Sequence, residues 1–190
     1  MKKRFLFLVT VLMLSMSANL FAAEKKNAKP FVIPEIREWK GAAGEFTITE
    51  STRIVYSNKN PELADVAKLL SEDYKKMFGI ELPVAEGKAA KGDIVIGIKN
   101  NKKVGNEGYT INIADKVEIT AGNARAAMWA TRTILQIAEQ NANVLPKGNI
   151  VDYPDYEMRS FMLDCGRKFI PISFLHEYVD FMAYYKMNTF

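Results

Sequence analysis

The chain of 190 residues contains only one cysteine and one histidine. A single cysteine excludes a disulfide within the chain, and one cysteine with one histidine excludes a zinc site built from those residue types. No basic stripe interleaved with aromatic residues is present, so nucleic-acid binding is not expected. Low-complexity tracts and repeats of solenoid length are also missing. The composition, 48% apolar and 25% charged, is typical of a folded globular chain with one core, or one domain and part of a second.

Residues 1–23 are predicted to be a secretory signal peptide. Residues 2–4 (Lys-Lys-Arg) form a positive start, Phe5–Met16 is an almost unbroken apolar run, and small residues end at Ala22-Ala23. The apolar run is near the shortest length that could span a membrane, so an uncleaved anchor is the alternative. The polar run that follows favours removal of the leader and an exported protein, either periplasmic or secreted. No later stretch is long and apolar enough to cross a bilayer, so no transmembrane segment is expected after signal removal.

The spacing of apolar residues predicts an α+β domain over residues 24–150, in which a β-sheet carries its helices on one face. Strands are expected at six places, namely 46–48, 53–56, 80–84, 93–98, 109–113 and 116–120. One helix is expected to begin at Asn60-Pro61 and to stop at Gly79, and a second begins at Gly122-Asn123. Residues 141–157 contain Pro and Gly interruptions and are expected to form an irregular connector.

A different pattern follows in residues 151–190. Ser160–Cys165 is expected to be an apolar strand with Cys165 buried, and residues 188–190 begin another strand. Residues 172–186 are expected to form a helix whose buried face consists of Leu175, Tyr178, Val179, Met182 and Ala183. One strand–helix unit cannot bury both faces of its strand. The chain is therefore expected to end inside its second domain.

Three charged residues around the expected strand are the candidates for function. Arg167 follows the C-terminal end of the strand, and its five-donor fork suits vicinal hydroxyls or a carboxylate. Asp164 could orient Arg167 as a charged hydrogen-bond partner, and Arg159 lies at the opposite end. If the strand belongs to a β/α barrel, the Arg167 end is the face that holds active sites. The alternative is a structural salt bridge between Asp164 and Arg167 that closes the loop.

Other candidates are weaker. His176 has Asp180 one helical turn away, which is more typical of a solvated helix face than of a metal site, so no metal is expected. Trp39 and Trp129 could stack on a sugar but are more typical of core or rim positions. The basic turn at 99–103 is expected to be solvated. Neither a nucleophile–base pair nor a couple of catalytic carboxylates is placed by spacing, so the sequence nominates no catalytic residue.

The segment Arg159-Ser160-Phe161-Met162-Leu163-Asp164-Cys165-Gly166-Arg167-Lys168-Phe169-Ile170-Pro171 resembles the opening of the catalytic barrel in glycoside hydrolase family 20, the β-N-acetylhexosaminidases. Residues 178–190 are similar to the first barrel helix and the start of strand two. Shorter matches upstream, such as Gly108-Tyr109-Thr110-Ile111 and Thr133-Ile134-Leu135-Gln136, resemble the accessory domain that precedes the barrel. Ser160 and Lys168 depart from the usual glycine and histidine of the pattern. After the predicted signal at 1–23, the resemblance implies an accessory domain at 24–150 and the truncated start of a (β/α)8 barrel at 151–190.

The resemblance also implies an activity. Arg167 matches the arginine that binds hydroxyls of the sugar in the −1 subsite, Asp164 matches its neighbouring aspartate, and Arg159 is a structural position. The family hydrolyses terminal N-acetylglucosamine or N-acetylgalactosamine without a cofactor, and the 2-acetamido oxygen of the substrate attacks the anomeric carbon. The Asp-Glu pair of that mechanism is expected beyond Phe190, so the 190 residues alone are expected to be inactive. A related amino-sugar or uronic-acid glycosidase and a non-catalytic glycan- or partner-binding protein are the alternatives.

Overall fold

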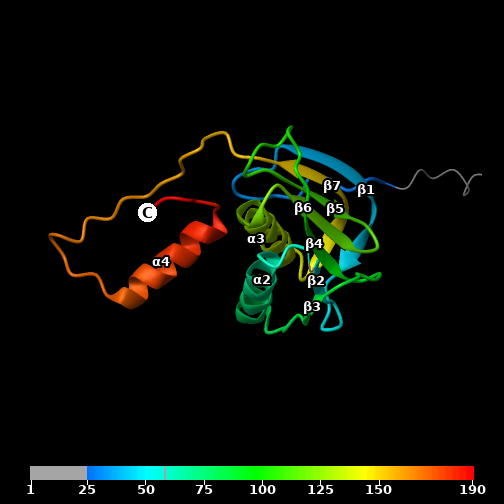
Figure 1. The fold of residues 1–190 in the computed structure, drawn as a ribbon, viewed down its shortest axis with the longest axis horizontal. Helices are drawn as coiled ribbons and strands as arrows, with labels where there is room; N and C mark the ends of the chain where they lie inside the picture. The colour runs from blue at the N-terminus through cyan, green and yellow to red at the C-terminus, as the bar shows by residue number, and fades with distance from the viewer. Residues whose placement is uncertain (1–24, 58) are drawn as a thin grey trace, which may run out of the picture.

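The computed structural model describes residues 25–57 and 59–190, so the predicted signal peptide at 1–23 lies outside the described residues. The described residues form one mixed sheet, two helices packed against it and a third helix near the C-terminus (Figure 1). The sequence prediction of an α+β fold with helices on one sheet face is confirmed. None of the described helices is long and apolar enough to cross a membrane.

The sheet has the strand order β1-β7-β5-β6-β4-β2-β3. Its strands are β1 (Glu38–Thr47), β2 (Ile54–Tyr56), β3 (Val84–Glu86), β4 (Ile94–Ile98), β5 (Tyr109–Ile113), β6 (Val117–Ala121) and β7 (Val144–Asp152). β1, β7, β5 and β6 pair antiparallel, whereas β6, β4, β2 and β3 pair parallel. Buried and half-buried residues alternate along β5 and β6, as predicted for a hairpin with one covered face.

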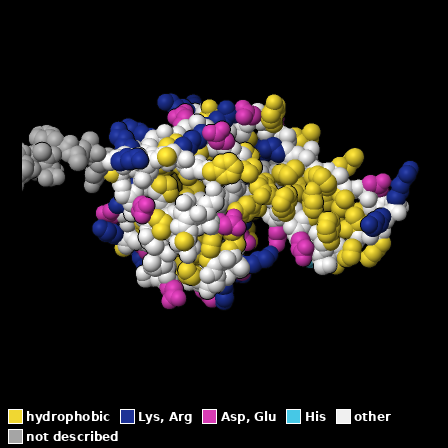
Figure 2. All heavy atoms as spheres, turned by 180° about the vertical axis from the view of Figure 1, so that it is seen from behind, with side chains coloured by type: hydrophobic (Ala, Val, Ile, Leu, Met, Phe, Trp, Pro, Cys, Tyr) yellow, Lys and Arg dark blue, Asp and Glu magenta, His cyan; other side chains and the backbone are white. Residues whose placement is uncertain are grey.

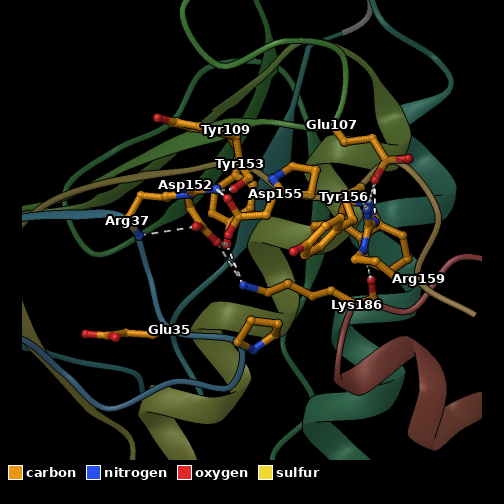
Figure 3. Close-up of a pocket in the computed structure, with 13 residues that line it drawn as sticks. Glu35, Arg37, Glu107, Tyr109, Asp152, Tyr153, Asp155, Tyr156, Arg159 and Lys186 are labelled. Atoms are coloured by element: carbon orange, nitrogen blue, oxygen red, sulfur yellow. Dashed lines mark hydrogen bonds and ion pairs between the residues drawn. The ribbon is translucent and has the colours of Figure 1, made fainter.

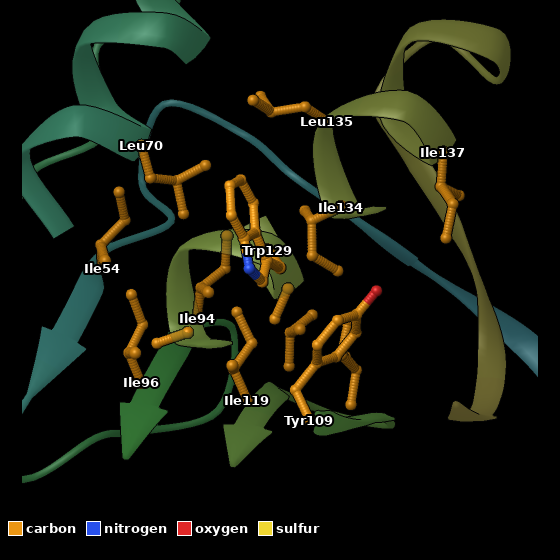
Figure 4. Packing of buried hydrophobic residues seen from close by; sticks show 14 of the residues in the cluster. Ile54, Leu70, Ile94, Ile96, Tyr109, Ile119, Trp129, Ile134, Leu135 and Ile137 are labelled. Carbon is orange, nitrogen blue, oxygen red and sulfur yellow. The ribbon is translucent and has the colours of Figure 1, made fainter. Parts of the chain in front are cut away.

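Helices α2 (Leu63–Phe78) and α3 (Ala124–Gln140) cover one face of this sheet (Figure 1). α3 begins where the sequence predicted, and Asn123 caps it through its side chain, which accepts a hydrogen bond of 2.9 Å from the Ala126 N–H. α2 ends at Gly79, which adopts the left-handed conformation expected of a stop. Alanines on α3 let the helix approach the sheet closely, and Tyr109, Trp129 and several isoleucines fill the layer between them (Figure 4).

Two boundaries differ from the sequence prediction. The first helix was expected to begin at Asn60-Pro61, but α2 begins at Leu63 and Asn60 does not cap it. The residues before it form a separate turn, in which the Leu63 N–H donates to the Asn60 carbonyl. The strand expected at residues 80–84 is instead β3, which begins at Val84 because only there does the chain pair with β2. Both errors arise at element ends, which local sequence defines poorly.

The largest correction is β7, because residues 141–157 were expected to be an irregular connector. Residues 144–152 instead form a strand between β1 and β5. Pro146 is tolerated because it stands opposite Glu45, at a break in the β1 register. Gly148 is required by packing rather than by a turn. A Cβ added there would lie 2.4 Å from the Trp39 ring.

Replacing Gly148 by alanine should therefore lower the free energy of unfolding by about 1–3 kcal/mol, the usual penalty for overpacking. Gly97→Ala on β4 is the matched control, because its Cβ would meet nothing closer than 3.9 Å. Urea denaturation of both variants measures the difference. Equal stability of the two would contradict the steric reason given for Gly148.

The C-terminal segment, residues 156–190, also departs from expectation. Only Ser160 and Thr189 form a bridge, a parallel one, so the expected strand at 160–165 is not formed. In α4 (Ile172–Tyr184) only Met182 of the predicted buried face is buried, and Cys165 is exposed rather than buried. A strand needs a neighbour along its length and a helix face needs a partner surface. α4 contacts the sheet unit, residues 25–155, chiefly near its C-terminal end, where Tyr184 bonds to α3.

The same segment exposes apolar surface, which agrees with its incomplete packing. Met162 is 90% exposed and Phe169 is 85% exposed. Phe161, Tyr178 and Phe190 stack on one another without being covered. Figure 2 shows hydrophobic side chains gathered over this part of the molecule. A soluble domain rarely leaves such an apolar cluster open.

Candidate functional site

The predicted substrate-binding loop lies on the surface of the C-terminal segment. Arg167 and Asp164 are both exposed. The Asp164 carboxylate accepts a hydrogen bond of 2.7 Å from the Gly166 N–H, and no ion pair joins it to Arg167 within the described residues. Neither the orienting contact nor the alternative salt bridge is formed. The role of Arg167 in binding sugar hydroxyls therefore stays a prediction.

Arg159, the third candidate, lies at the junction between the C-terminal segment and the sheet unit. Its guanidinium donates to the carboxylate of Glu107 and to the carbonyl oxygens of Lys186, at 2.7 Å, and Tyr156, at 2.8 Å. It also lies 5.8 Å from the centre of the Trp129 ring. Each of its three guanidinium nitrogens thus donates a hydrogen bond within the protein, which fits a structural role for Arg159.

Glu107 lies just before β5 and receives several donors at once. Besides Arg159 it accepts hydrogen bonds from Trp129 Nε1, at 3.2 Å, and from Asn188 Nδ2, at 3.3 Å. Burial, the largest single influence, raises the pKa of Glu107, but Arg159 and the other donors outweigh it, and the pKa lies below the usual glutamate value. The ionised carboxylate is therefore the form that the folded chain stabilises.

This pKa shift predicts how stability depends on pH. A carboxylate whose pKa is lowered on folding contributes stability above its unfolded pKa and loses that contribution as pH falls through its folded pKa. We expect the free energy of unfolding to decrease as the pH falls below the ordinary range of glutamate pKa values. We expect Glu107→Gln to make that decrease smaller. Urea denaturation at a series of pH values from about 7 to about 3 provides the measurement. An unchanged pH profile in the variant would contradict the prediction.

A second cluster at the junction is more deeply buried. Lys186 Nζ, just after α4, lies 3.0 Å from Asp152 Oδ2 at the end of β7 and 2.7 Å from the Tyr109 hydroxyl on β5. Tyr109 also bonds to Asp152, at 2.5 Å, and to Thr133 on α3. Figure 3 shows Lys186 reaching from the C-terminal segment to Asp152. Burial lowers the pKa of Lys186, and burial together with Asp152 raises the pKa of Tyr109.

Sequence reasoning missed this cluster. Lys186 was placed inside the expected helix and Asp152 in the expected connector, while Tyr109 was noted as a strand residue and as part of a match to the accessory domain. Lys186 adopts a left-handed conformation with φ of 59°, a position after a helix that usually holds glycine. A lysine in this conformation is uncommon, and here its side chain forms the buried contacts with Asp152 and Tyr109. The sequence placed the helix end at residue 186, whereas α4 ends at Tyr184, so the position of Lys186 after the helix was not predicted.

These residues line a cavity of about 150 Å³ between the sheet unit and the C-terminal segment (Figure 3). Its deepest polar groups already bond to one another. Near the rim, Arg37 pairs with Asp155 and stacks on Tyr153. The described residues hold no group of three or more His, Cys, Asp or Glu side chains arranged for a metal. The contacts at the junction hold the two parts of the chain together.

Two curated relatives match most of this chain, but the matched region is only a small part of each relative. The lacto-N-biosidase of Bifidobacterium bifidum is 27% identical over 163 residues, which cover 84% of this chain and 14% of that protein. The β-hexosaminidase of Porphyromonas gingivalis is 29% identical over 171 residues, which cover 84% of this chain and 22% of that protein. The chain thus spans less than a quarter of the length of either relative.

Two solved structures resemble most of this chain. The GH20 β-N-acetylhexosaminidase of Streptomyces coelicolor has a TM-score of 0.75 and 26% identity, over 86% of this chain and 34% of that one. A mutant β-hexosaminidase of Streptomyces plicatus, solved in complex with the product GlcNAc, has the same TM-score, identity and coverage.

Two family matches follow one another along the chain. Residues 29–153 match glycosyl hydrolase family 20, domain 2, and residues 156–190 match the catalytic domain of the same family. The first match alone covers well over half of the chain. The chain therefore belongs to glycosyl hydrolase family 20, with domain 2 followed by the start of the catalytic domain.

Proposed function

We propose that the chain is the N-terminal part of an exported β-N-acetylhexosaminidase that releases terminal N-acetylhexosamine from glycans. The observation that carries this proposal is the order of the two family matches, with domain 2 directly before the start of the catalytic domain. The relatives named β-hexosaminidase support the reaction. The GlcNAc bound in the Streptomyces plicatus structure supports an N-acetylhexosamine as the released sugar.

The reaction proposed is substrate-assisted hydrolysis with retention of configuration. The 2-acetamido oxygen of the substrate attacks the anomeric carbon, while a carboxylate steadies the amide nitrogen and a neighbouring glutamate protonates the leaving oxygen. Arg167 would hold hydroxyls of the same sugar by charged hydrogen bonds. We assign no acid or base to residues 1–190, and we propose that the reactive carboxylates belong to the remainder of the catalytic domain.

The proposal includes export. The charged start, apolar run and small residues of the first 23 positions are the pattern of a removable leader. Mass measurement of the mature N-terminus in the producing cell tests this part separately. A mature chain that retains Met1 and its apolar run would contradict export by signal cleavage.

The activity is tested by comparing the complete protein with residues 24–190. We expect the complete protein to hydrolyse an aryl N-acetyl-β-glucosaminide or galactosaminide and not the matching glucoside, since the acetamido group is the nucleophile. Residues 24–190 should show no turnover. A complete protein that binds glycans but cleaves none of these substrates would favour the non-catalytic alternative.

A further inference from the structure

We infer that Glu107, a residue of domain 2, is a positioning residue that sets the register between two extended segments at the start of the catalytic domain. Those segments are Arg159–Phe161 and Asn188–Thr189. The inference rests on contacts across the junction and not on the hydrolytic activity. It can therefore fail while the proposed function holds, and the reverse is also true.

The two segments are held together by very few contacts of their own. The Asn188 N–H donates to the Arg159 carbonyl at 2.9 Å, and the Phe161 N–H donates to the Thr189 carbonyl at 3.1 Å. The Asn188 side chain accepts a hydrogen bond of 3.0 Å from the Arg159 N–H. So short a ladder specifies its pairing weakly, because register depends on a long run of matched contacts.

Glu107 touches the side chains that begin both segments. One carboxylate oxygen accepts from the Arg159 guanidinium and the other accepts from Asn188 Nδ2 at 3.3 Å. The carboxylate is itself held by Trp129 Nε1 on α3, at 3.2 Å, and by its place next to β5. A group anchored in the sheet unit thus bridges the two segments and fixes where each one starts.

Because Glu107 and Arg159 are charged and largely buried, losing either partner of the bridge is unfavourable. The side chains of Glu107 and Arg159 are only 15% and 16% exposed, so a charge left without its partner there is poorly compensated by water. Arg125, 3.6 Å away, is the only other cation paired with Glu107 among the described residues, and it lies mostly in solvent. The lowered pKa of Glu107 agrees with an ionised carboxylate whose two oxygens both accept hydrogen bonds.

A slip in register would remove the bridge. Moving the second segment by two residues would bring Phe190 to the position of Asn188, and the carboxylate would then face an aromatic ring instead of an amide donor. Moving it by one residue would turn its side chains to the opposite face. Either slip leaves Glu107 with one partner fewer, so the carboxylate favours the observed register over both.

Hydrogen exchange measured by mass spectrometry in the full chain tests the inference. Glu107→Gln keeps the shape but replaces the charge and one acceptor with a donor. Glu118→Gln is the matched control, because Glu118 also pairs with a lysine and an asparagine amide but lies within the sheet. We expect peptides covering 159–161 and 187–190 to exchange about ten- to a hundredfold faster in Glu107→Gln only.

Peptides covering α2 and β2, which contain neither substituted glutamate nor a residue bonded to one, report whether the sheet unit itself is intact. They should exchange at the wild-type rate in both variants, which separates a positioning role from general destabilisation. Asn188→Ala should speed exchange of the same two peptides, and adding it to Glu107→Gln should have less than the summed effect. Unchanged exchange of residues 159–161 and 187–190 in Glu107→Gln, or equal loss of protection across the sheet, would overturn the inference.

Discussion

Replacing Lys186 by methionine should lower the free energy of unfolding by about 3–5 kcal/mol, the usual loss when one partner of a buried ion pair is removed. The side chains of Lys186 and Asp152 are 7% and 10% exposed, so the carboxylate left behind would have little access to water. Methionine keeps most of the apolar length of lysine. The loss is therefore assigned to the charge and its hydrogen bonds, which include the bond to Tyr109.

The measurement is urea denaturation followed by circular dichroism, with Lys68→Met as the control. Lys68 pairs with Glu72 along α2 at 3.7 Å, and both side chains are largely exposed, so this variant should change stability by no more than about 0.5 kcal/mol. Adding Asp152→Asn to Lys186→Met should recover part of the loss, because an amide carries no charge into the buried site. If Lys186→Met and Lys68→Met prove equally stable, the buried pair does not hold the junction.

Replacing Arg167 by alanine in the complete enzyme should reduce kcat/KM by more than about thirtyfold, which corresponds to a loss of over 2 kcal/mol of transition-state binding. The reason follows from the proposed role of Arg167, because alanine would remove the charged hydrogen bonds that this role gives it to sugar hydroxyls. The fold should be unaffected, since Arg167 is exposed and makes no ion pair within the described part of the chain.

Steady-state kinetics on an aryl N-acetyl-β-glucosaminide measures this effect. Lys88→Ala is the control, because Lys88 is also an exposed cation but lies in the loop after β3, far along the chain from the catalytic-domain segment. It should retain wild-type kcat/KM. An Arg167→Ala enzyme with the same kcat/KM as Lys88→Ala would show that Arg167 does not contact the substrate.

Sequence reasoning succeeded where a local pattern is enough. The 3.6-residue spacing in α2 and α3, the Asn123 cap and the alternation in β5 and β6 each depend on residues close together in the chain. It failed at β7, where Pro146 and Gly148 resemble connector residues. Whether they interrupt a strand depends on the partners they meet, which are Glu45 in a register break and the Trp39 ring.

The amino-acid sequence by itself determined the α+β class, the family resemblance of residues 159–190 and the candidate role of Arg167. Only the tertiary structure showed that Lys186, Asp152 and Tyr109 meet, and that Glu107 joins Arg159 to Asn188. The two residues in each of these four contacts are 34 to 81 positions apart. No periodicity brings such distant residues together, because their contacts arise from the packing of the C-terminal segment against the sheet.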